Sequence, residues 1–228
     1  MSAAAPPREI ALNATGAPVS NSKMRDFAAG TPVGELALFP LDTVLFPGGP
    51  LRLRLFEPRY LDMVGRCLKE SRPFGVVLIL EGEEGGAAPS VAASGTSARI
   101  VDFNTLPDGL LGIDCLGELR FRILSRRQQA DGLNLGEVEF LPEDAPSALP
   151  AELTHLGELL RELLPQLGER YAHASAHYED AGWVGNRWAE ILPLSTAERQ
   201  QLLELTDPLA RLAQVAAWST RQPPTAHV

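Results

Sequence analysis

FPLDTVLFPGGPLRLRLFEPRY, residues 39–60, is the stretch that decides the fold. Inside it, leucine and arginine alternate strictly from Leu51 to Leu55, which is the period of a strand with one buried face. We predict that the leucines face inward and that Arg52 and Arg54 face outward. The preceding run Pro47-Gly48-Gly49-Pro50 predicts a tight turn that leads into this strand.

A helix is predicted to follow the strand directly. Pro58 suits the first position of a helix, and Glu57 lies near the positive end of its dipole. Pro73 closes the helix, because proline cannot continue one. The inward stripe at helical spacing is predicted to consist of Tyr60, Leu61, Val64, Cys67 and Leu68.

Other strands are predicted between residues 35 and 141. Residues 35–39 form a short strand that Pro40 stops, and residues 74–80 are apolar throughout, which indicates a central strand buried on both faces. One hairpin joins 99–105 to 110–116, and a second joins 119–123 to 137–140. In the second hairpin we expect Arg120, Arg122 and the glutamates to point outward and to pair across the strands. About seven short strands with one inserted helix predict a closed or nearly closed barrel.

Helical periodicity replaces this pattern after three prolines between Pro142 and Pro150, where we predict a domain boundary. A leucine stripe runs from Leu153 to Leu167, with Pro165 as an expected kink. Ser195 and Glu198 form a capping box that opens one helix. Asp207-Pro208 opens the last helix, whose inward residues are predicted to be Leu209, Leu212, Val215 and Ala216.

These patterns predict an α+β protein in four parts. Residues 1–33 form a flexible tail, 34–145 the β-barrel domain, 146–221 a C-terminal α-helical bundle and 222–228 a second flexible tail. Met24 is an alternative translation start.

Composition excludes several classes of protein. No segment approaches the roughly 20 apolar residues of a membrane span, and the N-terminus carries no secretory signal. The net charge of -9 repels phosphate backbones, so we expect no nucleic-acid partner. Without an apolar span we also expect no membrane partner. Two cysteines, Cys67 and Cys115, favour free thiols and a cytoplasmic location over a disulfide.

Motifs for catalysis are absent from the sequence. It contains no G-x-x-x-x-G-K-[ST] loop for nucleotide phosphates and no G-x-S-x-G nucleophile elbow. A serine–lysine dyad would have to use Lys69 or Lys23, the two lysines of the chain. Paired carboxylates such as Glu83 and Glu84 lie in Gly- or Pro-rich stretches and read as solvated loops. We therefore predict a protein that is not an enzyme and that needs no cofactor.

Two minor candidates for binding remain. His173 and His177 have the i, i+4 spacing that puts both imidazoles on one helix face, and Glu179 or Asp180 could add an oxygen ligand. A solvent-facing pair explains them as well, and we predict no metal site. Arg120, Arg122, Arg126 and Arg127 form a basic patch, but neighbouring glutamates offset it, which disfavours RNA binding.

Several motifs together resemble the substrate-binding domain of Lon proteases. They are the Phe46-Pro47-Gly48 turn, the Phe56-Glu57-Pro58-Arg59-Tyr60 run and the Phe74-Gly75-Val76 strand. Residues 95–100, the 106–109 hairpin, residues 119–123 and the C-terminal run from Leu192 also match, so the resemblance covers roughly residues 35–218. The protein cereblon carries a related domain.

The resemblance implies a PUA-like pseudobarrel followed by a helical bundle, in a stand-alone bacterial protein. It also implies a substrate-recognition or adaptor role with unfolded or tagged polypeptides as partners, and possibly a separate protease or ATPase. A binding surface is expected at a strand edge or in the groove between barrel and helices. The alternatives are an enzyme or small-molecule-binding protein that uses this cleft, and an RNA-binding PUA-like module. Candidate peptide-binding or motif residues are Phe46, Pro47, Phe56, Glu57, Arg59, Tyr60, Trp183 and Trp188, for which a purely structural role remains open.

Overall fold

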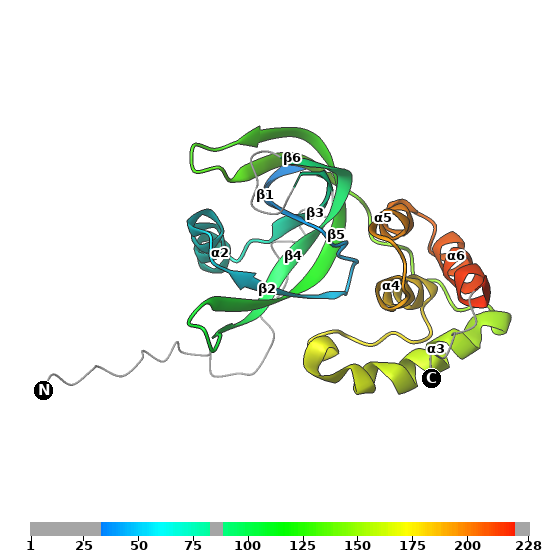
Figure 1. Cartoon of the computed structure of the whole chain (residues 1–228). Coiled ribbons are helices and arrows are strands. Elements are labelled where there is room, and N and C mark those ends of the chain that lie inside the picture. Colours follow the sequence, from blue (N-terminus) through cyan, green and yellow to red (C-terminus); the bar gives the residue numbers. More distant parts are fainter. Residues whose placement is uncertain (1–32, 83–88, 222–228) are drawn as a thin grey trace, which may run out of the picture. The chain divides into compact units, whose positions relative to one another are not determined.

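The computed structural model describes residues 33–82 and 89–221 (Figure 1). Both predicted tails lie outside these residues, except that Val33 is described. Lys23, Met24, Glu83 and Glu84 also lie outside them. The strands are β1 (Val33–Leu41), β2 (Pro50–Leu55), β3 (Phe74–Glu81), β4 (Ser90–Thr105), β5 (Leu111–Gln128) and β6 (Asn134–Phe140). The helices are α2 (Pro58–Glu70), η1 (Ala151–Leu153), α3 (Thr154–Leu163), η2 (Leu164–Tyr171), α4 (Ala181–Ile191), α5 (Thr196–Glu204) and α6 (Pro208–Arg221).

Five of the strands close into a hydrogen-bonded ring. β1 lies between β3, with which it is parallel, and β6, with which it is antiparallel. β3 pairs with β4, β4 with β5, and β5 with β6, so the ring returns to its start. β2 lies outside the ring and pairs antiparallel with β5. A closed or nearly closed barrel of about seven strands was predicted, and the described chain closes it with five strands and adds β2 outside the ring.

Several strands are longer than predicted, among them β1, β4 and β5. β1 runs through Pro40, which pairs with Val77 of β3. β6 pairs with β1 only as far as Leu38, so Pro40 lies where one edge of the strand needs no hydrogen bonds, a position that tolerates proline. β5 fuses two predicted strands, because Gly117 continues the strand rather than ending it.

The face of α2 that packs on the barrel differs from the predicted one. Tyr60, Val64 and Cys67 are buried as expected, but Met63 completes the stripe, while Leu61 and Leu68 are 37% and 42% exposed. The ring of Tyr60 stacks on Phe39 of β1 with centroids 3.9 Å apart, and this contact sets which side of the helix faces inward.

Both cysteines are buried free thiols in the same core. Burial raises the pKa of Cys67 to about 11 and that of Cys115 to about 12. Both groups are therefore protonated at neutral pH, which makes them inert packing residues.

The helices follow the sequence signals closely. The Ser195–Glu198 capping box is present, since the Ser195 hydroxyl accepts from the N–H of Glu198 and the Glu198 carboxylate accepts from the N–H of Ser195. α3 gives way at Leu164-Pro165 to η2, where the kink was expected. Leu167 and Leu209 are exceptions: they were predicted inward and are 38% and 43% exposed. No helix among the described residues is long and apolar enough to cross a bilayer.

An arginine pair joins barrel and helices around Asp144, and we name this set (Arg120, Asp144, Arg211) the Asp144 clamp. Arg120 was predicted to point outward, but it is 5% exposed because its guanidinium donates to the carbonyl oxygens of Leu203 and Leu205 and, over 2.5 Å, to Asp144. Arg211 of α6 donates to the other Asp144 oxygen over 2.6 Å. Neighbouring Arg122 does point outward, and its Nη1 lies 3.6 Å from Oε2 of Glu139. A side chain on the barrel is thus fixed by carbonyls of the helical region.

Asp144→Ala should be severely destabilising, because it leaves two buried guanidinium groups without their carboxylate. We expect a loss of about 3–5 kcal/mol in the free energy of unfolding, measured by denaturant titration. Glu139→Ala is the matched control, since its ion pair with Arg122 is solvent-exposed and should change stability by about 0–1 kcal/mol. Equal losses in the two variants would contradict the role given to the clamp.

Candidate functional site

The tight turn, predicted at residues 47–50, is formed by residues 46–49 and is packed against α4. Phe46 is fully buried, and its carbonyl oxygen accepts a hydrogen bond from the N–H of Gly49. Gly48 has a φ of 71°, a conformation that glycine adopts without strain. A Cβ on Gly49 would lie 2.9 Å from the backbone carbonyl oxygen of Phe46 and 2.1 Å from Oε1 of Glu190, so this position also favours glycine. The turn is therefore shaped to fit the helix beneath it.

Arg187 of α4 holds the turn in place. Its side chain is 0% exposed, and Nη2 donates to the carbonyl oxygen of Pro47 over 2.9 Å and to Oε1 of Glu190 over 2.6 Å. The hydroxyl of Tyr171 donates to the second Glu190 oxygen over 3.1 Å. We name Pro47, Tyr171, Arg187 and Glu190 the turn clamp. It joins the barrel turn, η2 and α4.

Burial dominates the electrostatics of the turn clamp. It raises the pKa of Glu190, although the Arg187 charge and the Tyr171 hydrogen bond both favour the carboxylate. It also raises the pKa of Tyr171, in the same direction as the neighbouring Glu190 charge. Shifted pKa values can mark a catalytic site, but here the Glu190 carboxylate is held by Arg187 and Tyr171, and Nη2 of Arg187 is held by the Pro47 carbonyl. The other two guanidinium nitrogens of Arg187 are buried without a hydrogen-bond partner among the described residues. The arrangement is suited to holding elements together.

The Phe56-Glu57-Pro58-Arg59-Tyr60 motif forms a second junction. Arg59 pairs with Glu57 over 2.6 Å and donates to the carbonyl oxygen of Gly132 over 3.2 Å. Its guanidinium also lies 5.0 Å from the centre of the Tyr60 ring. The motif therefore ties the start of α2 to the turn between β5 and β6.

The two tryptophans proposed for a groove pack among the helices. Trp183 is 8% exposed and meets the Tyr178 ring edge-on with centroids 5.1 Å apart. Trp188 is half-buried, and its Nε1 donates to the carbonyl oxygen of Leu156 over 3.1 Å. Phe56 is different, because it is 67% exposed at the end of β2. Of the eight candidate residues, Phe56 is the one that offers a large apolar surface to a ligand.

The outer edge of β2 is the candidate binding surface, and we name it the β2 edge (residues 50–56). β2 pairs with β5 on one side and with no other described strand. Arg52 and Arg54 are exposed and Leu51 and Leu53 half-buried, as the alternation predicted. A hollow of about 300 Å³ opens at the start of the strand. It is lined by Pro50, Leu51, Arg52, Asp114, Cys115, Leu116, Arg170 and His173.

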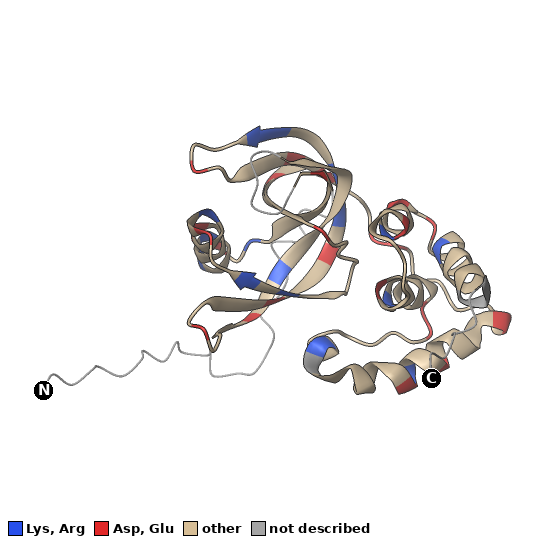
Figure 2. Cartoon of the chain, viewed as in Figure 1, with Lys and Arg blue, Asp and Glu red and all other residues tan. Residues whose placement is uncertain are grey.

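Charge does not gather into a nucleic-acid surface in the described part. Acidic and basic residues are interspersed along strands and helices (Figure 2). Arg120 is buried in the Asp144 clamp, Arg122 and Arg127 form ion pairs with Glu139 and Glu35, and Arg126 donates to the carbonyl oxygen of Pro89. The basic patch that suggested RNA binding is thus engaged within the protein.

The two histidines do not share a helix face, which corrects the predicted spacing argument. Both follow η2 in a segment of turns and bends. The His177 ring lies near Trp183, with centroids 6.4 Å apart, whereas His173 lines the hollow beside the β2 edge.

Sequence reasoning missed the two buried charges of the turn clamp. Arg187 and Glu190 have i, i+3 spacing on α4, where Trp183 and Trp188 were the residues singled out from the sequence. Their spacing was a signal, but it is typical of any exposed helix. The neighbouring sequence does not distinguish a buried Arg–Glu ion pair from one on the surface of a helix.

Comparisons with known proteins place this geometry in a family. Residues 35–219 match the family model described as the ATP-dependent protease La (LON) substrate-binding domain. The chain belongs to the Lon substrate-binding domain family. The resemblance first read from the turn and helix motifs is therefore confirmed.

Individual relatives agree with this assignment. The crystal structure of a Lon N-terminal domain protein from Xanthomonas campestris is similar, with 40% sequence identity and a TM-score of 0.67, over 81% of this chain and 98% of that one. The Lon protease of Phenylobacterium zucineum is 30% identical over 198 residues, 82% of this chain but 24% of its own length. Cereblon of Xenopus tropicalis is 30% identical over 119 residues, 51% of this chain and 25% of its own. The chain thus spans about a quarter of these full-length relatives.

Arg187→Met should show that the turn clamp depends on charge. At about pH 8 we expect a loss of about 3–5 kcal/mol, because the Glu190 carboxylate is left buried without its cation. Burial holds the folded-state pKa of Glu190 above its ordinary 4.5. The Glu190 carboxyl of the folded protein therefore binds its proton more tightly than the same group in the unfolded chain. The free energy of unfolding falls as pH rises from the unfolded-state pKa to the higher folded-state pKa. Denaturant unfolding should accordingly give a smaller loss at about pH 5.

The double variant Arg187→Met/Glu190→Gln is the control for this prediction. It has no carboxyl group at position 190, so the extra pH dependence of the single variant should disappear. A pH dependence that persists in the double variant would contradict the assignment to Glu190.

Proposed function

We propose that this Lon-family domain is a non-catalytic polypeptide-binding module, a substrate-recognition or adaptor protein. Its ligands are unfolded or tagged polypeptides, which it passes on unchanged to a separate protease or ATPase. The observation that carries the proposal is the unpaired outer edge of β2 among the described strands.

The β2 edge suits a ligand of variable sequence. In an antiparallel pair, alternate residues bond to the partner strand, so the residues between them direct N–H and C=O groups to the free side. An extended polypeptide offers the same backbone groups whatever its sequence, and it can add to such an edge as a further strand. Backbone pairing therefore supplies affinity without strict specificity.

Side chains at the β2 edge add apolar contact. Phe56 stands 67% exposed at one end of the strand, and the hollow lies at the other end. Between them, Arg52 and Arg54 pair with Asp114 and Asp108 over 2.6 and 2.5 Å. Charged side chains on an edge strand oppose uncontrolled pairing between copies.

The proposal of a non-catalytic role has two supports. The family match is to a substrate-binding domain and not to a catalytic one. The carboxyl groups whose pKa is raised by burial, Glu118 and Glu190, are bonded to Arg99 and Arg187 and do not line the hollow. An enzyme that uses the cleft is therefore less well supported than a binding module. An RNA-binding module has the least support, because the arginines of the basic patch are bonded to groups of the protein itself.

Three finer assignments belong to the same proposal. We propose that the closed ring with its external β2 is a PUA-like pseudobarrel. We place the border between the barrel domain and the helical domain at residues 145–146, in the proline-rich linker that carries Asp144. We also propose a cytoplasmic location, where buried thiols such as Cys67 and Cys115 stay reduced.

The test uses a permanently unfolded probe, reduced and carboxymethylated α-lactalbumin, titrated into the full-length protein. Fluorescence anisotropy should show saturable binding, and hydrogen exchange should show protection at residues 50–56. Phe56→Ala should weaken binding about tenfold, the effect of losing partial burial of a phenylalanine ring. Because Phe56 is exposed, the variant should keep the stability of the parent.

Leu209→Ala is the matched control, because Leu209 is an exposed apolar residue of α6 and lies outside the β2 edge. It should bind the probe like the parent protein. No binding at about 100 µM probe, protection confined to other elements, or equal weakening in both variants would overturn the proposal. Cleavage of the probe by the purified protein would refute the non-catalytic part alone.

A further inference from the structure

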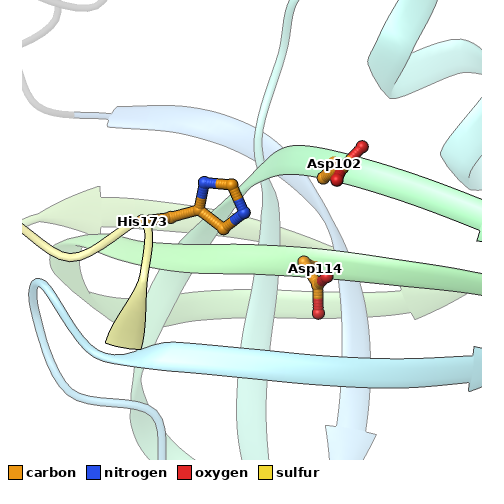
Figure 3. A group of neighbouring side chains, drawn as sticks. All are labelled: Asp102, Asp114 and His173. Atoms are coloured by element: carbon orange, nitrogen blue, oxygen red, sulfur yellow. The ribbon is translucent and has the colours of Figure 1, made fainter. Parts of the chain in front are cut away.

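Three potential metal ligands from distant parts of the chain meet beside the hollow. Asp102 lies on β4, Asp114 on β5, and His173 in the segment after η2. Figure 3 shows the imidazole of His173 reaching over the two neighbouring strands that carry the aspartates. One ligand atom from each residue lies within 4.8 Å of the other two. No sequence spacing links these residues; only the tertiary structure brings them together.

The two aspartates are an unfavourable pair by themselves. They are direct partners in the β4–β5 register, and like charges directly opposite each other on a sheet are destabilising. Arg52 of β2 neutralises Asp114 through an ion pair of 2.6 Å. Asp102 accepts a hydrogen bond from the backbone N–H of Phe103 and forms no ion pair within the described residues. Across the three strands, Arg52, Asp114 and Asp102 therefore carry two negative charges and one positive charge, and a bound cation would balance the second aspartate.

We propose that Asp102, Asp114 and His173 bind one divalent metal ion of the zinc type. An imidazole nitrogen with two carboxylate oxygens is a donor set that zinc accepts. Ligand bonds of about 2.0–2.2 Å require the three atoms to approach to roughly 3.5 Å. Asp102 and His173 are exposed and Asp114 is half-buried, so small side-chain rotations can close the site without disturbing the core.

Arg52 supports the site rather than excluding the ion. Its Nε atom lies 2.6 Å from one oxygen of Asp114, and its Nη2 atom lies 3.4 Å from the other. One carboxylate oxygen can turn to the metal while the guanidinium keeps the second. Hydrogen bonds of this kind to a ligating carboxylate orient it and are a usual part of metal sites.

Binding has a structural consequence. Three protein ligands leave at least one coordination position for water, which is the pattern of an open site rather than a closed structural one. Because His173 lies on the segment between η2 and α4, the ion would fasten this segment to the outer face of the sheet. Exchange of amide protons in residues 172–178 should therefore slow when metal is bound.

The experiment titrates the tag-free, metal-stripped full-length protein with zinc chloride by calorimetry in a buffer that does not bind zinc. We expect one equivalent to bind with a dissociation constant below about 10 µM. Asp102→Asn and His173→Ala should each weaken binding by at least about tenfold. Both side chains are exposed, and circular dichroism of the variants checks that they fold. His177→Ala is the matched control, because His177 lies in the same segment but outside the trio, and it should bind like the parent.

Each outcome decides the proposal. Absence of one-to-one binding below about 100 µM zinc overturns it. So does binding that Asp102→Asn and His173→Ala leave unchanged, or that His177→Ala weakens equally, since zinc would then be held by surface histidines. If one of the two variants fails to fold, hydrogen exchange of the parent decides: zinc must protect residues 172–178, and protection elsewhere alone refutes the site.

Discussion

The buried guanidinium of Arg187 is the contact on which the rest of the structure depends. It joins the Pro47 carbonyl of the barrel turn to Glu190 of its own helix. Removing a charge from water costs several kcal/mol, so such a group is tolerated only when its partners are in place. Turn, η2 and α4 must therefore assemble together. The Asp144 clamp repeats this solution elsewhere on the barrel, again with arginine and carboxylate at the junction with the helices.

The position of β2 follows from this junction. The N–H of Gly48 donates to the carbonyl oxygen of Gly117, and the N–H of Gly117 donates to that of Gly49. A Cβ on Gly117 would lie 2.2 Å from the Phe46 carbonyl oxygen, so the turn can approach β5 this closely only at a glycine. The strand that leaves the turn therefore runs along β5, outside the ring, with its far edge unpaired by described strands. The same clamp that stabilises the fold thus creates the surface proposed to bind polypeptides.

The hollow beside β2 lies next to both proposed sites, the polypeptide-binding β2 edge and the metal site, but the two sites use different atoms. Polypeptide addition would use backbone atoms of the β2 edge together with Phe56. Metal binding would use side chains on the outer face of β4 and β5 with His173. Asp114 belongs to both neighbourhoods, because it pairs with Arg52 of the edge strand and lines the hollow. An ion there would therefore change the charge next to the edge while leaving its backbone groups untouched.

Local chemistry was readable from the sequence by itself. The Leu–Arg alternation of β2, the proline that opens α2, the Ser195–Glu198 capping box and the family motifs each depend on residues a few positions apart. What the tertiary structure alone decided depends on distant partners. Arg120 faces inward because carbonyl groups 83 and 85 residues away accept its hydrogen bonds. Distant partners also decide that Met63 rather than Leu61 faces the core of the barrel. They likewise bring Asp102, Asp114 and His173 together. The direction of a side chain and the burial of a charge are set by the partners that the fold supplies, and periodicity along the chain carries no record of those partners.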